Sequence, residues 1–330
     1  MNLDFSVIKN QKNLLAFSAG VDSVALFFLL LEQNISFDIA IIDYNLRVQS
    51  KDEISYAEEL ALKYNKTIFI KDIKLENHSN FEKTARDIRY KFFEEIILEN
   101  SYKNLITAHQ LNDKLEWFLM QLSKGAGLVE LIGFNEFEQK NNYKIYKPLL
   151  NITKDELENF LQINNHKYFI DESNFDEKYK RNFFRHNFSN LFLQNFSSGV
   201  KKSFEYLQND LNSLNIQNNP IKKIEELEIF LNQKDDNLNI RTIDLSLKKR
   251  GILLSSAQRD EILKQKELTI SHKINISILE DYIYIAPICS EIMDKKFKEL
   301  CRIAGIPPKI RPYLYEAKID LSALRLNHKP

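Results

Sequence analysis

The N-terminal half of the chain alternates short runs of apolar residues with longer stretches in which apolar residues recur every three or four positions. Short apolar runs are typical of buried strands, and the longer spacing is typical of helices with one buried face. The pattern predicts strands at 14–18, 38–43, 67–73 and 104–109. It predicts helices near 22–33, 50–65, 81–98 and 111–123. This alternation favours an α/β fold with a doubly wound parallel sheet.

The periodicity changes in the middle of the chain. No strand pattern is present from Ile152 to about Gln217. Thr153, with Glu156 three residues later, is typical of a capping box at the start of a helix. This part of the chain is therefore predicted to be helical.

The last hundred residues return to short apolar runs. They predict strands at 242–247, 273–279 and 281–287. A helix containing KKFKELCRIAG should follow and end before Pro307 and Pro308. We therefore expect a doubly wound domain over 1–151, a helical extension over 152–217 and a small α+β domain over 218–330.

Composition narrows the class of protein. The 46 basic residues balance the 46 acidic ones, which argues against a nucleic-acid binder of strongly basic overall charge. Only Cys289 and Cys301 occur, too few for a four-cysteine zinc site, an iron–sulfur cluster or a disulfide framework. The longest apolar stretch, VALFFLLL, is far short of a membrane span, and the first residues lack a signal-peptide pattern. We expect a cytoplasmic protein without a membrane segment, either a monomer or a homodimer.

The neutral total hides two basic regions. Residues 178–223 contain eight Lys or Arg and two acidic residues, and residues 295–325 contain eight and three. Each region is either a surface for RNA or phosphate or an ordinary solvated face.

The turn after the first predicted strand carries the main chemical signal. It reads Ser18-Ala19-Gly20-Val21-Asp22-Ser23 and leads directly into a helix. Small residues at such a turn expose backbone N–H groups, and the positive end of the helix points to the same place, so the turn suits a phosphate. It lacks the Gly-Lys-Ser/Thr of a Walker loop and the glycine triplet of a dinucleotide-binding turn.

This turn resembles the Ser-Gly-Gly-x-Asp-Ser pattern of the PP-loop ATP pyrophosphatases, with Ala19 in place of one glycine. The alternative is an ordinary strand-to-helix turn. Further motifs follow in order: Asp43-Tyr44-Asn45-Leu46-Arg47, Glu82-Lys83-Thr84-Ala85-Arg86-Asp87-Ile88-Arg89-Tyr90, Thr107-Ala108-His109-Gln110-Leu111-Asn112-Asp113-Lys114-Leu115-Glu116, Lys124-Gly125-Ala126-Gly127-Leu128, Tyr146-Lys147-Pro148-Leu149-Leu150, Asp171-Glu172-Ser173-Asn174 and Arg181-Asn182-Phe183-Phe184-Arg185. As a set, they resemble the tRNA(Ile)-lysidine synthetase family over residues 13 to about 190. The resemblance implies a PP-loop, adenine nucleotide alpha hydrolase-like fold.

Two carboxylates follow a histidine at helical spacing. His109, Asp113 and Glu116 fall along one face of the helix predicted at 111–123. The carboxylates suit an ammonium group, although a solvated helix start has the same pattern. The resemblance implies that Asp113 and Glu116 bind free L-lysine and that His109 lies at the reaction centre.

Two arginine pairs also occur at helical spacing. Arg86 and Arg89 either neutralise a triphosphate or pair with neighbouring acidic residues. Arg181 and Arg185 match an Arg-Asn-x-x-Arg element that, by the resemblance, closes over ATP or RNA.

The resemblance assigns the remaining roles. ATP is expected on the turn 18–23 with Arg86 and Arg89, and Asp22 is the nearest candidate to position Mg²⁺. The residues expected in catalysis are Asp22, His109 and Arg181. The residues expected to contact tRNA are Arg185, Lys201, Lys202, Lys295, Lys296, Lys298, Lys309 and Arg311.

The reaction implied is a two-step ligation. ATP adenylates the C2 oxygen of the wobble cytidine of a CAU-anticodon tRNA(Ile), and the ε-amine of lysine then displaces AMP to give lysidine. The sequence leaves the general base open between His109 and a carboxylate. A tRNA thiolase of the same superfamily is the enzyme alternative, but it generally needs cysteines near the nucleotide, and none precedes Cys289. A non-catalytic nucleotide- or RNA-binding homologue is the other alternative.

The sequence departs from the family pattern at several positions in these motifs. They are Tyr44, Gln110, Asn112, Lys114 and Trp117.

Overall fold

The computed structural model describes residues 3–45, 49–73, 81–170, 180–214, 216–217 and 219–324, the side chains of Phe81 and Glu82 excepted. Leu46, Arg47 and the motif Asp171-Glu172-Ser173-Asn174 lie outside the described residues. The chain forms two compact units, Met1–Leu211 and Asn212–Pro330. The first unit includes residues 152–211, most of the segment expected from the sequence to be a separate helical extension. The boundary expected at 151 therefore stays a prediction.

The first unit contains a six-stranded sheet of order β3-β2-β1-β4-β6-β5. Its strands are β1 (Asn13–Ala16), β2 (Phe37–Asp43), β3 (Ile68–Asp72), β4 (Asn104–Ile106), β5 (Phe137–Gln139) and β6 (Lys144–Tyr146). All neighbouring pairs are parallel except β5 with β6. The parallel α/β sheet predicted from the sequence is thus confirmed, whereas the β5–β6 hairpin was not predicted.

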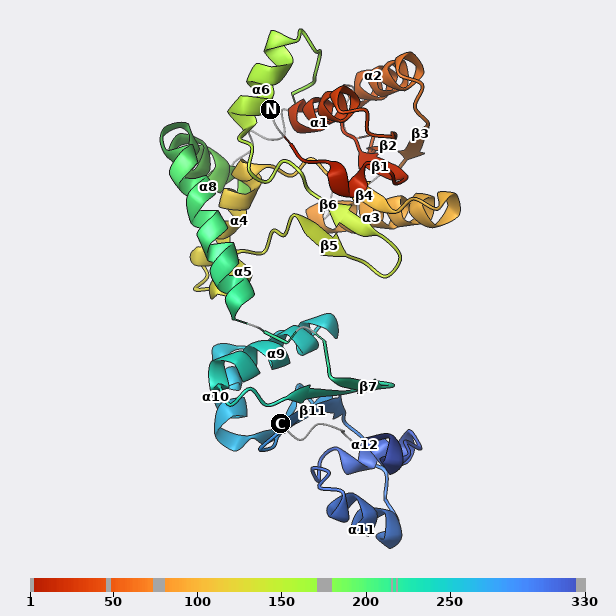
Figure 1. Ribbon diagram of the computed structural model, residues 1–330, viewed down its shortest axis with the longest axis vertical. Coiled ribbons are helices and arrows are strands. Elements are labelled where there is room, and N and C mark those ends of the chain that lie inside the picture. The colour runs from red at the N-terminus through yellow and green to blue at the C-terminus, as the bar shows by residue number, and fades with distance from the viewer. Residues whose placement is uncertain are drawn as a thin grey trace. The chain divides into compact units, whose positions relative to one another are not determined.

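Helices cover both faces of this sheet (Figure 1). They are α1 (Val21–Glu32), α2 (Ser50–Lys63), α3 (Phe81–Asn100), α4 (Leu111–Leu122), α5 (Leu128–Leu131), α6 (Lys154–Ile163), α7 (Lys180–Phe184) and α8 (Asn190–Ser213), with a short 3₁₀ turn η1 (Ser6–Ile8) and a π-helical turn η3 (Arg185–Ser189). Side chains of β1 alternate between the two cores: Leu15 packs with α1 and α2, and Leu14 packs with α3. The capping box predicted at Thr153 and Glu156 starts α6.

The second unit contains a five-stranded antiparallel sheet of order β7-β8-β11-β10-β9. Its elements are β7 (Lys222–Ile224), β8 (Leu227–Leu231), α9 (Asp236–Lys249), α10 (Ser256–Gln265), β9 (Glu267–Ile270), β10 (Ile274–Ile278), β11 (Tyr282–Pro287), α11 (Lys295–Ile303), α12 (Arg311–Glu316) and the 3₁₀ turn η4 (Leu321–Leu324). Helices α9 and α10 pack on one face, and α11 and α12 on the other. The predicted α+β class is confirmed.

The strand predicted at 242–247 is wrong, because this segment lies inside α9. The alternation of TIDLSL fits a strand over six residues. Over the full helix, however, Ile240, Ile243 and Leu247 recur at three and four and are all buried in one core. Asp235 caps the helix by accepting a hydrogen bond from the N–H of Leu238.

Candidate active site

The site lies where the sheet order reverses direction. β1 pairs with β2 on one side and with β4 on the other, all in parallel, so the turns after β1 and β4 leave the same edge of the sheet. Ligands of open α/β sheets bind at such a point. Both strands end two or three residues earlier than predicted, which releases residues 17–20 and 107–110 into loops.

The turn 18–23 is held by its two serines. The hydroxyl of Ser23 accepts a hydrogen bond from the N–H of Ser18 at 3.2 Å and lies 3.2 Å from the Ser18 hydroxyl. Ala19 has a left-handed backbone with φ of 56° and is fully buried, so it adopts the conformation that favours glycine. Gly20 caps α1 without a side chain, and the first N–H groups of the helix have no acceptor within it. This turn can hold an anion.

Asp22 is in the first turn of α1 and carries a buried oxygen, Oδ1, that accepts no hydrogen bond from any described residue. Burial, with a smaller contribution from the Asp113 carboxylate, raises the pKa of Asp22 to about 7. A buried, unsatisfied carboxylate oxygen beside a phosphate-binding turn suits a cation, and Mg²⁺ is usually bound by only one or two carboxylates together with phosphates and waters. The residue therefore fits Mg²⁺. Across the described ranges, no group of three or more His, Cys, Asp or Glu forms a metal cage.

His109 follows β4 and lies in a partly buried position. Its Nδ1 is 2.9 Å from the hydroxyl of Thr107, and its ring contacts Phe134 edge to face at 5.6 Å between centroids. Burial lowers the pKa of His109 to about 4, against the opposing effect of Asp113. The imidazole is therefore neutral near pH 7.

Helix α4 begins with a capping box in which Gln110 accepts from the N–H of Asn112, and Asp113 accepts from the N–H of Gln110 at 3.0 Å. This box fixes Asp113 on the first turn of the helix. Burial alone would raise the pKa of Asp113, but the positive charge of Arg181 and the other contacts of the carboxylate outweigh it and hold the pKa below its usual value.

The structure brings the two predicted carboxylates and the second arginine pair together. Arg181 contacts Asp113 at 2.5 Å and Glu116 at 2.8 Å. Arg185 contacts Glu116 at 2.7 Å and lies 3.8 Å from Asp113. Glu116 has 0% of its side chain exposed. The spacing of each pair was visible in the sequence, but their pairing with each other was not, because 65 to 69 residues separate them.

Arg86 and Arg89 lie on α3 and are exposed. The guanidinium of Arg86 lies 4.8 Å from the centre of the Tyr90 ring, and its charge contributes to lowering the pKa of His109. Burial raises the pKa of Tyr44, and a hydrogen bond with Arg89 opposes that rise. Arg86 is thus near His109, while Arg89 contacts Tyr44.

Two residues near His109 received no role from the sequence. Thr107 contacts the imidazole directly, and Lys147 is buried, hydrogen-bonded to the carbonyl of Asn135, and paired with Glu138 at 3.2 Å. Both belong to motifs that the sequence showed. Their positions in the Thr107-Ala108-His109 and Tyr146-Lys147-Pro148 motifs were the available signal.

Three positions that depart from the family pattern hold elements together. Asn112 donates to Asn190 of α8 at 3.1 Å and accepts from the N–H of Lys154 of α6 at 3.1 Å. Lys114 lies 4.5 Å from the ring centre of Phe204. Trp117 donates to the carbonyl of Glu130 at 2.8 Å. We assign these three side chains to packing around the site.

The basic residues expected to bind tRNA are spread over both units. Lys201 pairs with Glu156 at 2.9 Å, and Lys202 pairs with Glu205 at 2.9 Å. Arg185, in the first unit, pairs with Glu116 as described above. The remaining five lie in the second unit, where Lys295, Lys296 and Lys298 are exposed on α11, and Lys309 and Arg311 are partly buried.

The two cysteines lie in the second unit. Cys301 is fully buried in a hydrophobic core, and Cys289 contacts Glu316. Burial raises the pKa of both thiols. In the described part of the chain, no helix is both long enough and apolar enough to cross a membrane.

Comparison with known proteins relates the chain to a group of enzymes. Residues 3–192 match the PP-loop domain family. The chain is 48% identical over 324 residues to the tRNA(Ile)-lysidine synthase of Campylobacter jejuni strain RM1221, with 97% of each chain covered. It is 43% identical over 314 residues to the tRNA(Ile)-lysidine synthase of Wolinella succinogenes, with 95% of each covered.

The fold is shared with solved structures, among them the U34-tRNA thiolase of Methanococcus maripaludis with its 4Fe–4S cluster. That structure has a TM-score of 0.51, 21% identity, and coverage of 66% of this chain and 77% of that chain. At this identity the likeness concerns the fold alone.

Proposed function

The chain belongs to the tRNA(Ile)-lysidine synthase family, and from this premise we propose how its residues form lysidine in tRNA(Ile). ATP is the energy source. In detail, the proposed reaction is the ligation of free L-lysine to C2 of the wobble cytidine in a CAU anticodon. The observation that supports it best is the convergence of the turn 18–23, His109 and the cluster of Asp113 and Glu116 with two arginines at one sheet edge.

The first step makes C2 of the cytosine reactive. The C2 oxygen attacks the α-phosphorus of ATP, and the bond to the β-phosphate oxygen breaks with release of pyrophosphate. We assign the turn 18–23 to the phosphates, because its backbone N–H groups and the start of α1 point to one place. Asp22 would hold Mg²⁺, and the ion would offset the negative charge of the phosphates. Arg86, near His109, is assigned to the triphosphate with Arg89.

The second step joins lysine to the base. The ε-amine attacks C2, the bond from C2 to the adenylated oxygen breaks, and AMP leaves with that oxygen. The amine must first lose a proton, and we assign His109 as the acceptor because its ring is unprotonated near pH 7 and the Asp113 carboxylate beside it favours the protonated form. Thr107 fixes the orientation of the ring through Nδ1.

Lysine is assigned to Asp113 and Glu116. In the structure these carboxylates are balanced by Arg181 and Arg185. An incoming ammonium group would therefore exchange with an arginine rather than fill an open site, and the displaced guanidinium would be available to the phosphates of ATP. Asp113 retains some exposure and Glu116 none, so Asp113 is the carboxylate that lysine reaches first.

The proposal is tested by the dependence of product release on each substrate. AMP and pyrophosphate should form with ATP, lysine and a CAU-anticodon tRNA(Ile) transcript. Omission of lysine should block the second product, AMP, while a transcript with a different wobble base should block both. Release of AMP without lysine but with a sulfur donor would support the thiolase alternative.

The cysteines distinguish the two enzyme classes further. A protein carrying both Cys289→Ser and Cys301→Ala should form lysidine at the wild-type rate, because both thiols lie in the second unit and neither approaches the turn 18–23 along the chain. The measurement is turnover per folded protein, with folding checked by circular dichroism. Loss of turnover in a folded double variant would contradict the ligase mechanism and favour thiol chemistry.

The exposed lysines of α11 provide a test of tRNA docking. Changing Lys295, Lys296 and Lys298 together to Gln should weaken tRNA binding and reduce the slope of affinity against salt by roughly one for each lysine that contacts a phosphate. The same change at Lys9, Lys63 and Lys103, which are exposed in the first unit, is the matched control. Equal affinities and slopes for both triple variants would show that α11 is only a solvated face.

A further inference from the structure

The helical run from α7 to α8 carries a row of phenylalanines on its surface. This aromatic ladder consists of Phe183, Phe184, Phe188, Phe192 and Phe196. Phe184 is partly buried, and the other four side chains are between 43% and 58% exposed. The rings form two contacting groups: the centroids are 5.5 Å apart for Phe184 and Phe188 in the first, and 5.2 Å apart for Phe192 and Phe196 in the second.

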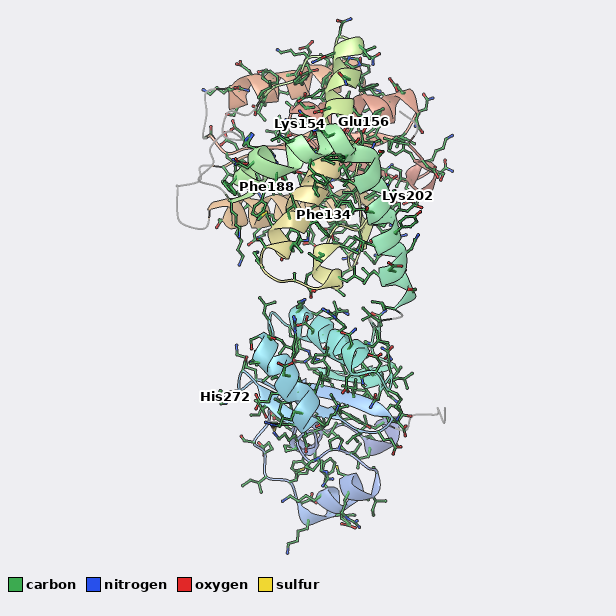
Figure 2. All side chains as sticks on the ribbon, turned by 90° about the vertical axis from the view of Figure 1, so that its left-hand side faces the viewer. Phe134, Lys154, Glu156, Phe188, Lys202 and His272 are labelled. Atoms are coloured by element: carbon green, nitrogen blue, oxygen red, sulfur yellow. The ribbon has the colours of Figure 1, made fainter. Side chains whose placement is uncertain are left out.

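The spacing of the ladder places successive rings close to one another. Four of its members recur every four residues, a spacing that makes side chains neighbours on a helix. The π-helical turn η3 includes Phe188, and α8 has non-helical dihedral angles at Phe196. Figure 2 shows the face that carries Phe188.

The ladder is not the core-facing side of these helices. Leu193, Val200 and Phe204 of α8 already pack against Leu111 and Leu115 of α4. The phenylalanines form a second apolar face that folding leaves about half exposed, and an exposed apolar surface of this kind marks a binding site.

The charge around the ladder indicates the partner. Residues 180–204 contain five Lys or Arg and one His but no Asp or Glu. Four of the five pair with carboxylates outside this segment, as described above for Arg181, Arg185, Lys201 and Lys202. The ammonium of Lys180 lies 5.7 Å from the centre of the Phe184 ring. Exposed aromatic rings with basic side chains among them are a combination with which proteins bind unpaired bases.

The ladder also begins at the catalytic site. Arg181 and Arg185 come from the same helical run, and both contact Glu116. A polynucleotide whose target base sits at His109 would have its neighbouring nucleotides close to this run. An enzyme that modifies a base must take it out of the stack, and the flanking bases then need new surfaces to stack on.

We propose that the aromatic ladder stacks the unpaired anticodon-loop bases that flank the target cytidine of the tRNA. The inference rests on the proposed function for the identity of the loop. It adds a binding surface for bases beside the basic residues expected to contact phosphates. The rings supply stacking, which is tolerant of sequence, while the catalytic site selects the cytidine.

The test compares aliphatic with aromatic replacements. Phe188→Leu combined with Phe192→Leu should weaken binding of a CAU-anticodon tRNA(Ile) transcript by about 10-fold or more, because each lost base–aromatic stack costs about 5- to 150-fold. Phe188→Tyr with Phe192→Tyr should stay within about 3-fold of the wild type, since the ring remains. Phe137→Leu, an exposed phenylalanine outside the ladder, is the control. KM values for ATP and lysine at saturating tRNA should not change.

A second arm identifies the bases. A transcript with abasic sites on both sides of the wobble cytidine should bind the wild type about as weakly as the intact transcript binds the double leucine variant, and combining the two changes should add little. The proposal would be overturned if the losses of binding free energy from the abasic sites and from the leucine variant added fully. It would also be overturned if the Leu and Tyr variants lost the same tRNA affinity. A third result would also overturn it: the double leucine variant keeps its tRNA affinity, and sedimentation shows a dimer for the wild type but not for the variant. The ladder would then bind a second copy of the chain.

Failure of this inference is distinguishable from failure of the proposed function. Wild-type protein that forms lysidine while the leucine variant binds tRNA normally would overturn the ladder alone. Wild-type protein that shows the ladder-dependent binding but forms no lysidine would overturn the function and leave the stacking surface in place. Wild-type protein that binds no tRNA would overturn both.

Discussion

Replacing Asp22 by Asn is expected to lower ATP-dependent AMP formation by at least about 100-fold, a loss typical of removing one preorganised electrostatic group from an active site. The amide keeps the size of the side chain but removes the charge. Asp22 Oδ1 is buried, accepts no hydrogen bond from any residue that the structure describes, and lies in the first turn of the helix that follows the phosphate-binding turn. An amide cannot replace a carboxylate that organises Mg²⁺.

The same variant should gain stability while it loses activity. Burial raises the pKa of Asp22 from 3.8 to about 7, so between these values the folded protein holds a proton that the unfolded chain has released. The stability contributed by this position therefore falls as the pH rises from about 4 to about 7. Asn cannot ionise, so Asp22→Asn should melt near the wild-type temperature at pH 4 and above it at pH 8 without Mg²⁺.

Melting curves at both pH values and AMP formation at saturating ATP check this prediction. Asp260→Asn, at an exposed carboxylate on α10, is the matched control and should change neither quantity. A folded Asp22→Asn protein with near-normal AMP formation would remove the carboxylate from the chemistry. If Asp22→Asn and the wild type differ in melting temperature by the same amount at pH 4 and at pH 8, Asp22 is not a buried acid with a raised pKa.

Replacing Glu116 by Gln should destabilise the fold and impair lysine use together. Glu116 has no exposed side-chain area and contacts both Arg181 and Arg185, so the amide removes a buried negative charge from beside two guanidinium groups. Removing one partner of a buried ion pair costs about 3 kcal/mol of unfolding free energy, and partial exposure of Arg181 keeps the expected loss at the low end. KM for lysine should rise more than KM for ATP.

Denaturant unfolding and separate titrations of lysine and ATP measure the two effects. Glu299→Gln breaks an exposed arginine pair on α11 and should alter little. An unchanged unfolding free energy for Glu116→Gln would contradict the buried cluster. A rise in KM for ATP with lysine use intact would move the carboxylates to the nucleotide site.

Much of the first unit could be predicted from the sequence because its strands are short apolar runs separated by amphipathic helices. The hairpin of β5 and β6 could not be predicted, since each of its strands has only three residues and β5 is largely exposed. The segment 242–247 was misassigned because a six-residue window fits both periods, and only the full length of α9 distinguishes them.

The candidate site likewise has features that the sequence shows and contacts that it does not. The turn 18–23 and the spacing of His109, Asp113 and Glu116 are local, so the sequence shows them directly. The contacts of Arg181 and Arg185 with these carboxylates depend on how α7 packs against α4, which local spacing does not encode. The aromatic ladder repeats every four residues in the sequence, but only the packing of α8 on α4 shows which apolar face is already covered.

The central claim is that this chain joins lysine to the wobble cytidine, and one measurement tests it most directly. A CAU-anticodon tRNA(Ile) transcript is incubated with the protein, ATP and isotopically labelled lysine, digested, and analysed by mass spectrometry of the nucleosides and of the anticodon fragment. We predict labelled lysidine at the wobble position, formed in proportion to AMP released. An unmodified cytidine after ATP has been consumed, or a sulfur atom in place of the label when a sulfur donor is present, would contradict the account.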